Sequence, residues 1–199
     1  MLGKYANRAT VMRFGIPAIF AALLGAWVLL RLSDLAPLTG YTLLGRDFLI
    51  TPVKLTVALL MLFFALMELI PAFDKLAFDT KYLPAGGVLS GFFGGLSGHQ
   101  GALRSAFLIR AGLSKESFIA TGVVIACMVD LTRLTVYTAH FSHAGISENF
   151  LLLLTATASA FIGVVLGKRL VKKVRMRTIQ IIVSVMLSVI AIGLGAGII

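Results

Sequence analysis

Long stretches without a charged residue restrict the fold of this chain more than any other feature. Three of them, Phe14–Leu30, Phe150–Gly167 and Thr178–Ile199, approach or exceed the ~20 apolar residues that a helix needs to cross a bilayer. Only 13% of the residues are charged, about half the share of a soluble domain, and 59% are hydrophobic. The sequence therefore predicts a polytopic integral membrane protein of the all-α class.

The apolar pattern predicts about six hydrophobic segments. They are Phe14–Leu32, Val53–Ala72, Pro84–Ala111, Glu116–Thr138, Asn149–Gly167 and Met176–Gly197. Basic residues precede the first segment, as they do in a secretory signal peptide. Its uncharged run is longer than the ~7–15 residues of a signal-peptide core, so we interpret it as a membrane helix.

Glycines are concentrated in the third segment, where seven of the chain's 20 glycines fall within residues 86–101. Each glycine costs roughly 1 kcal/mol in a helix interior relative to alanine, so the pattern predicts a broken helix. Proteins tolerate such a break in a membrane where it lines a cavity or is buried in protein. The alternative interpretation is close helix packing, because Gly87, Gly91 and Gly95 are spaced by four.

Polar side chains beside this break make it a candidate substrate site. The sequence predicts a short helix from Gly101 to Ala111, ended by Gly112, with its first amides near Ser97–Gly101. Helix N-terminal amides and the guanidinium of Arg104 suit a small oxyanion. The candidate substrate-binding residues are Gly94, Gly95, Ser97, Gly98, His99, Gln100, Gly101 and Arg104.

Other ionisable residues in apolar segments form a second group of candidates. Asp130 and Arg133 lie three residues apart on one helical face. They are interpreted either as a pair that couples transport to an ion or as a plain ion pair that permits the helix to insert into the membrane. We interpret Glu68 as a side chain that reaches the membrane interface, and Cys127 as a small buried hydrophobe.

The sequence predicts no metal site, no cofactor and no enzymatic activity. His140 and His143 have no suitably spaced ligand partner, and no phosphate loop or nucleophile–base pairing is recognisable. The net charge is +10, but its basic residues lie mostly at the ends of apolar runs, which argues against nucleic acid as a partner.

Loop charges predict the orientation. The basic stretch 168–177 should be cytoplasmic, and residues 140–148, which lack lysine and arginine, should face outward. If all six segments cross the membrane, Lys4, Arg8 and Arg13 would face outward, which conflicts with the same rule.

Two parts of the chain resemble each other. Ile16–Gly25 aligns with Leu154–Gly163, and at the same offset Arg31 meets Arg169. Weak internal repeats are typical of transporters, although chance similarity between apolar helices is the alternative. We therefore divide the chain into residues 1–83, the second half of a first repeat, and residues 84–199, a complete second repeat. The counterpart of the glycine-rich segment is missing before the first half-repeat, so the chain is a short form or takes its partner from a second subunit.

The stretch from Gly91 to Arg104, which reads GFFGGLSGHQGALR, resembles the sulfite exporter TauE/SafE family of membrane transporters. The runs Ala111-Gly112-Leu113 and Ala120-Thr121-Gly122 look like the continuation of the family's glycine-rich segment. The chain departs from the family in having Ser97 and His99 where a glycine triplet is common, and in lacking a first glycine segment. The resemblance implies transport of small sulfur-containing or organic anions, often outward, with Gly94, Gly95, Gly98 and Gly101 matching the family segment.

We therefore expect a transporter of small anions, sulfite-like or sulfonate-like, in the bacterial cytoplasmic membrane. The expected partners are the lipid bilayer, the anion and a second subunit such as another copy of the chain. The alternative is an anion channel, or a membrane subunit that transports nothing without a partner chain.

Overall fold

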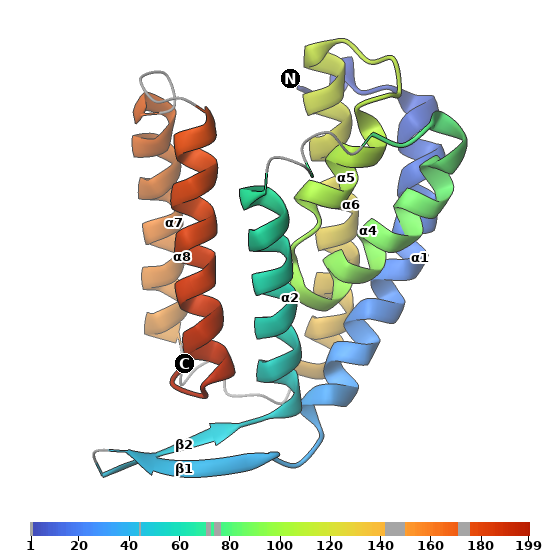
Figure 1. The fold of residues 1–199 in the computed structure, drawn as a ribbon. Helices are drawn as coiled ribbons and strands as arrows, with labels where there is room; N and C mark the ends of the chain where they lie inside the picture. Colours follow the sequence, from blue (N-terminus) through green and yellow to red (C-terminus); the bar gives the residue numbers. More distant parts are fainter. Residues whose placement is uncertain (1, 44, 71–72, 74–76, 142–149, 171–175) are drawn as a thin grey trace.

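A computed structural model describes residues 2–43, 45–70, 73, 77–141, 150–170 and 176–199 (Figure 1). Long helices dominate the described chain: α1 (Arg8–Ser33), α2 (Pro52–Leu69), α4 (Leu83–Ser97), α5 (Gly101–Leu108), α6 (Lys115–Phe141), α7 (Phe150–Leu170) and α8 (Met176–Gly195). The shorter elements are the 3-10 helices η1 (Leu2–Tyr5) and η2 (Thr80–Tyr82) and the strands β1 (Thr39–Leu43) and β2 (Arg46–Ile50).

Four of the described helices are long and apolar enough to cross a membrane: α1, α2, most of α6, and α8 from Arg177. The N-terminal segment is one of them, as the length of its apolar run predicts. Helix α1 begins at Arg8 and not at the predicted Phe14, because the side chain of Asn7 caps it. The Asn7 amide oxygen accepts a hydrogen bond from the backbone N–H of Thr10 at 3.0 Å.

A small antiparallel hairpin departs from the all-α prediction. Strands β1 and β2 pair Tyr41 with Phe48, and the two aromatic rings stack with centroids 5.4 Å apart. Gly45 allows the turn with φ at 76°. The Tyr41 hydroxyl donates to the Ala196 carbonyl at 2.6 Å, which ties the hairpin to the end of α8. The two strands lie between long apolar runs, and we did not predict them because their alternation of apolar and polar residues is short.

The glycine-rich segment, predicted as a broken helix over residues 84–111, forms two helices, since α4 ends at Ser97 and α5 begins at Gly101. The chain also folds back on itself between them. Helix α4 spans 15 residues, about 22 Å at 1.5 Å per residue, which is shorter than the ~30 Å hydrocarbon core. Helix α5 returns beside it: the backbone N–H of Phe78, before α4, donates to the Ala106 carbonyl of α5 at 3.1 Å. The ring of Phe78 stacks on Phe107 at 4.3 Å. The pair α4–α5 is therefore a hairpin whose two ends lie at the same end of the molecule (Figure 1).

Glycines on one face of α4 allow it to contact the backbone of α1. A Cβ on Gly91 would lie 2.5 Å from the Ala18 Cα, and one on Gly95 would lie 2.8 Å from the Ala22 Cα. Gly87 meets the backbone of Phe14 in the same way, one turn earlier on both helices. Close packing between small residues therefore explains the spacing of Gly87, Gly91 and Gly95.

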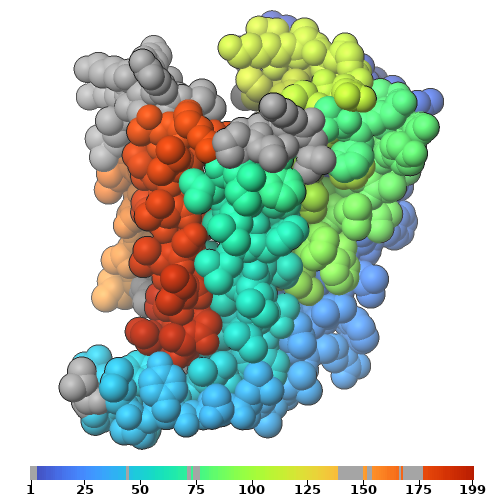
Figure 2. Space-filling view, in the orientation of Figure 1, coloured from blue at the N-terminus to red at the C-terminus, as the bar shows by residue number. Residues whose placement is uncertain are grey.

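The remaining helices pack around this pair. Apolar side chains of α1, α5 and α6, among them Phe14, Phe107, Ile125 and Val129, form a buried cluster against α4. Helix α2 packs along α8, and the two lie side by side on the face shown in Figure 2. The β-hairpin crosses one end of this face (Figure 2). The α4–α5 hairpin thus lies between the α1–α6 side and the α2–α8 pair.

Candidate functional site

The candidate site is centred on the break between α4 and α5. Gly98 has φ at 79°, a left-handed conformation that favours glycine, and its N–H donates to the Gly94 carbonyl at 2.9 Å. Helix α5 then begins at Gly101, and the side chain of Gln100 does not cap it. The first N–H groups of a helix lack partners within the helix, so the start of α5 is suited to an anion.

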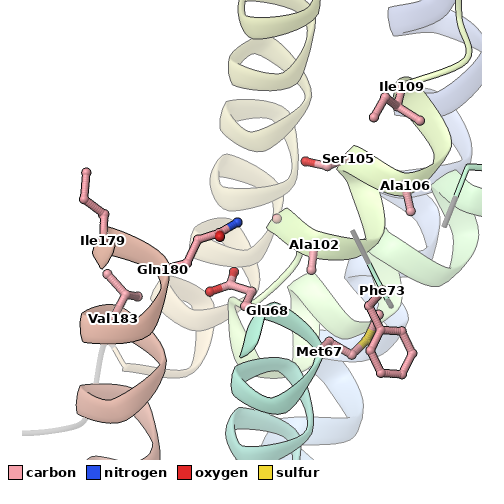
Figure 3. A pocket seen from close by; sticks show the side chains of 11 residues that line it. Met67, Glu68, Phe73, Ala102, Ser105, Ala106, Ile109, Ile179, Gln180 and Val183 are labelled. Atoms are coloured by element: carbon pink, nitrogen blue, oxygen red, sulfur yellow. The ribbon is translucent and has the colours of Figure 1, made fainter. Parts of the chain in front are cut away.

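Two cavities border the start of α5. The larger, of about 490 Å³, lies between α2, α5 and α8 (Figure 3). The smaller, of about 150 Å³, lies against the break itself and is lined by Gly98, His99 and Gln100 together with Phe64 and Leu187. Both cavities share Glu68, Gly101 and Ala102. The uncapped first turn of α5 is therefore next to space that can hold a small ligand.

Polar side chains from three helices point into the larger cavity. Figure 3 shows the Glu68 carboxylate of α2 and the Gln180 amide of α8 directed toward each other, with the Ser105 hydroxyl of α5 nearby. We expected Glu68 at the membrane interface and made no prediction for Gln180 or Ser105. Each of these residues is a polar residue in an apolar helix, which is the only indication of a role in the sequence. The packing of α2 on α8 brings Glu68 and Gln180 together.

The opposite side of the break carries the ionisable residues of α6. The guanidinium of Arg133 lies against the break, with its Nη1 atom 2.5 Å from the position of a Cβ on Gly98. Its Nη2 atom is 3.8 Å from the Asp130 carboxylate, so the pair proposed from the sequence spacing does meet. Asp130 also interacts electrostatically with Arg104 of α5. One carboxylate thus lies among two guanidinium groups, which leaves one positive charge in excess.

Several buried polar atoms at the break have no hydrogen-bond partner within the described chain. They are Arg104 Nη1, Arg133 Nε and Gln100 Oε1. The Gln100 side chain fills the space next to Gly94, and the whole residue is only 5% exposed. A buried donor without a partner costs about 1–3 kcal/mol, so unsatisfied donors on cationic groups favour an anionic ligand.

Apart from Ser97, whose hydroxyl bonds back to α4, the predicted substrate-binding residues fall into three groups in the structure. Gly98, His99, Gln100 and Gly101 line the small cavity. Arg104 faces α6 instead, with its Nε atom 3.5 Å from the position of a Cβ on Gly122. Gly94 and Gly95 serve packing: Gly94 contacts Gln100 and Val129, while Gly95 contacts α1 and accepts a hydrogen bond from the Tyr137 hydroxyl at 3.2 Å.

Hydrogen bonds within the break fix the orientation of Ser97 and His99. The Ser97 hydroxyl donates to the Phe93 carbonyl at 3.1 Å, one turn back along α4. The His99 ring donates from Nδ1 to the Ser97 carbonyl at 3.0 Å. This arrangement leaves Nε2 of His99 as the ring nitrogen for a ligand in the small cavity.

Two further expectations concern His143 and Cys127. His143 lies outside the described residues, and the described part of the chain contains no group of three histidine, cysteine or acidic residues arranged for a metal ion. Cys127 is exposed on α6, so the interpretation as a buried hydrophobe was wrong. In a helix that crosses a membrane, an exposed apolar face is covered by lipid, and this face cannot be distinguished from a buried one by hydropathy alone.

Comparison with protein families supports the membrane and transport expectations. The family model described as Sulfite exporter TauE/SafE matches residues 3–194, a range that runs from η1 almost to the end of α8. No match was found among curated proteins or solved structures.

Proposed function

The chain belongs to the sulfite exporter TauE/SafE family, a family of multi-pass membrane transporters, and on that premise we propose that it transports a small oxyanion such as sulfite or a sulfonate across the cell membrane. The observation that carries the proposal is the excess positive charge of two partly buried arginines at the helix break. Arg104 and Arg133 each keep a buried N–H donor without a partner in the described chain, and Asp130 balances only one of them.

The dimensions and chemistry of the break favour a small ligand. A cavity of about 150 Å³ has room for one compact oxyanion and a few waters, at ~30 Å³ for each water. The first-turn amides at Gly101 and Ala102 supply the donors, and the positive end of the α5 dipole adds a favourable field. Gly98 keeps the backbone free of a side chain at the point where Arg133 approaches.

The α4–α5 hairpin also supports one orientation. Since the hairpin starts and ends on one side of the membrane, α1 begins on the side where α7 ends and α8 begins (Figure 1). Lys4, Arg8 and Arg13 then lie on the same side as the end of α7 and the start of α8. The basic residues at these two helix ends, such as Lys168, Arg169 and Arg177, make this side cytoplasmic by the positive-inside rule. The conflict that arises when every segment crosses the membrane is thereby removed.

Flux through reconstituted protein tests the proposal. Proteoliposomes containing the full chain should take up [35S]sulfite with saturable kinetics, and unlabelled sulfite on the opposite side should accelerate exchange. An Arg133→Gln variant should lose at least tenfold in apparent affinity, because it removes one of the two partly buried cations at the break. Arg31→Gln is the matched control, since Arg31 is exposed at the other end of α1. No saturable flux, or equal flux in both variants, would contradict the proposal.

A further inference from the structure

The β-hairpin lies at the level where three of the membrane-crossing helices begin or end. Helix α1 ends at Ser33, shortly before β1, and β2 ends at Ile50, just before α2 begins at Pro52. The Tyr41 hydroxyl bonds to the carbonyl of Ala196, which directly follows α8. Figure 1 shows the hairpin running across the ends of these helices. Since a span ends where the hydrocarbon core meets the lipid headgroups, the hairpin lies at the level of the headgroups.

The two faces of this hairpin differ in polarity. Successive residues of a strand point to opposite faces, so the register places mostly apolar side chains on one face: Thr39, Tyr41, Leu43, Arg46, Phe48 and Ile50. The opposite face carries Gly40, Thr42, Asp47 and Leu49, and there the Thr42 hydroxyl donates to the Asp47 carboxylate at 2.6 Å. The bond from Tyr41 to Ala196 turns the first face toward the helices, and therefore toward the bilayer that surrounds them.

Leu43 and Arg46 lie on this face next to the turn of the hairpin, where they pair across the two strands. Figure 1 shows the turn extending past the end of α8. Leu43 is 53% exposed, and Arg46 is exposed as well. Among the described residues no carboxylate forms a salt bridge with Arg46, and the neighbouring Asp47 accepts from Thr42 on the opposite face. An apolar side chain and a guanidinium group thus project together toward the bilayer.

Aromatic residues mark the same membrane interface independently of the strands. Trp27 is exposed on α1, and the guanidinium of Arg31, in the last turn of that helix, lies 5.2 Å from the centre of its ring. Tryptophan and tyrosine are enriched where a membrane meets water, because their rings are apolar and carry one polar group. Trp27 near the end of α1 and Tyr41 in β1 therefore agree in placing the hairpin beside the lipid headgroups.

We propose that this face of the hairpin binds the phospholipid surface, with Leu43 inserted into the apolar layer and Arg46 donating hydrogen bonds to a lipid phosphate. A guanidinium group matches a phosphate with two parallel N–H donors. The long arginine side chain lets its charged group stay among the headgroups while its methylene groups lie along apolar surface. Insertion of Leu43 removes its exposed apolar surface from water. The hairpin is thus a lipid-binding element at the end of α2 and α8 that is opposite to the α4–α5 termini.

Quenching of tryptophan fluorescence by brominated phospholipid tests this inference without any transported anion, so its outcome does not depend on the proposed transport. The full chain carries Trp27→Phe, which removes its single tryptophan, together with Leu43→Trp. Thr42→Trp, on the opposite face of the same strand, is the matched control. Both chains are reconstituted in liposomes of phosphatidylcholine and phosphatidylglycerol, with or without bromine near the ester end of the acyl chains. Iodide on both sides of the membrane measures access from water.

We expect the brominated lipid to quench the Leu43→Trp chain at least twofold more than the Thr42→Trp chain, and iodide to show the reverse order. Adding Arg46→Gln to the Leu43→Trp chain should weaken the lipid quenching, and Arg46→Lys should largely preserve it. Equal quenching of the two chains by the brominated lipid, or quenching that Arg46→Gln leaves unchanged, would overturn the inference. Shielding of the Leu43→Trp chain from both quenchers would also overturn it, because protein and not lipid would then cover this face.

Discussion

The Cα atom of Ala18 on α1 lies 2.5 Å from the position that a Cβ on Gly91 of α4 would take. Substituting Gly91 with alanine must therefore separate two helix backbones along their shared face. We expect Gly91→Ala to lower stability by about 1–3 kcal/mol, the usual cost of overpacking. Thermal unfolding in detergent, followed by circular dichroism, measures the loss.

Gly163→Ala is the matched control for this substitution, because it changes the same residue type in a helix where a Cβ meets no atom within 4 Å. We expect it to be neutral, or stabilising by up to about 1 kcal/mol from helix propensity. If both variants lose the same stability, the loss in Gly91→Ala does not come from the contact between α1 and α4.

Gly98→Ala separates backbone strain from the contact with Arg133. The φ of 79° costs an alanine about 1–2 kcal/mol, and the new methyl group would displace the guanidinium that lies 2.5 Å away. Gly112→Ala has a comparable φ of 66° but nothing within 4 Å. We expect a similar loss of stability in both variants and a fall in sulfite affinity in Gly98→Ala alone, measured by equilibrium binding.

Asp130→Asn should strengthen anion binding. The carboxylate offsets one of two guanidinium charges at the break, so its neutral replacement leaves both Arg104 and Arg133 available to the ligand. We expect about tenfold tighter sulfite binding, equivalent to about 1.4 kcal/mol, with the opposite change in Arg133→Gln. Weaker binding in Asp130→Asn would show that Asp130 holds the arginines in place and does not compete with the anion.

Glu68 and Gln180 face each other across the larger cavity, so an isosteric exchange at each position tests the charge of that cavity. Glu68→Gln removes a negative charge from the walls of both cavities and should increase sulfite affinity. Gln180→Glu adds one to the larger cavity and should reduce the affinity severalfold. Binding isotherms at constant ionic strength measure both, and unchanged affinity in the pair would place the anion elsewhere.

Cysteine accessibility tests the return of the α4–α5 hairpin. In a Cys127→Ser background, Thr80→Cys and Ser114→Cys should be shielded from an impermeant maleimide added to whole cells, and Thr42→Cys should react. If the glycine-rich segment crosses the membrane, Thr80 and Ser114 lie on opposite sides, and one of them will react while the other does not.

The sequence by itself determined the class of this protein. Uncharged runs such as Thr178–Ile199 indicate a membrane protein, and the run from Gly91 to Arg104 resembles the family whose model matches residues 3–194. Glycine spacing also indicated the packing face of Gly87, Gly91 and Gly95, because a period of four places residues on one side of a helix whatever the partner is. Each of these features depends only on residues that are close together in the chain, so it can be recognised without the tertiary structure.

Tertiary structure decided what each polar residue faces. The sequence placed His99, Gln100 and Arg104 in one group, but the turn at Gly98 directs His99 and Gln100 to the small cavity and Arg104 to α6. It also brought Glu68 and Gln180 together from helices more than a hundred residues apart. The physical reason is that a helix surrounded by lipid can be apolar on every side, so its sequence does not mark the faces that meet its neighbours. Only close packing between the helix surfaces decides which faces meet.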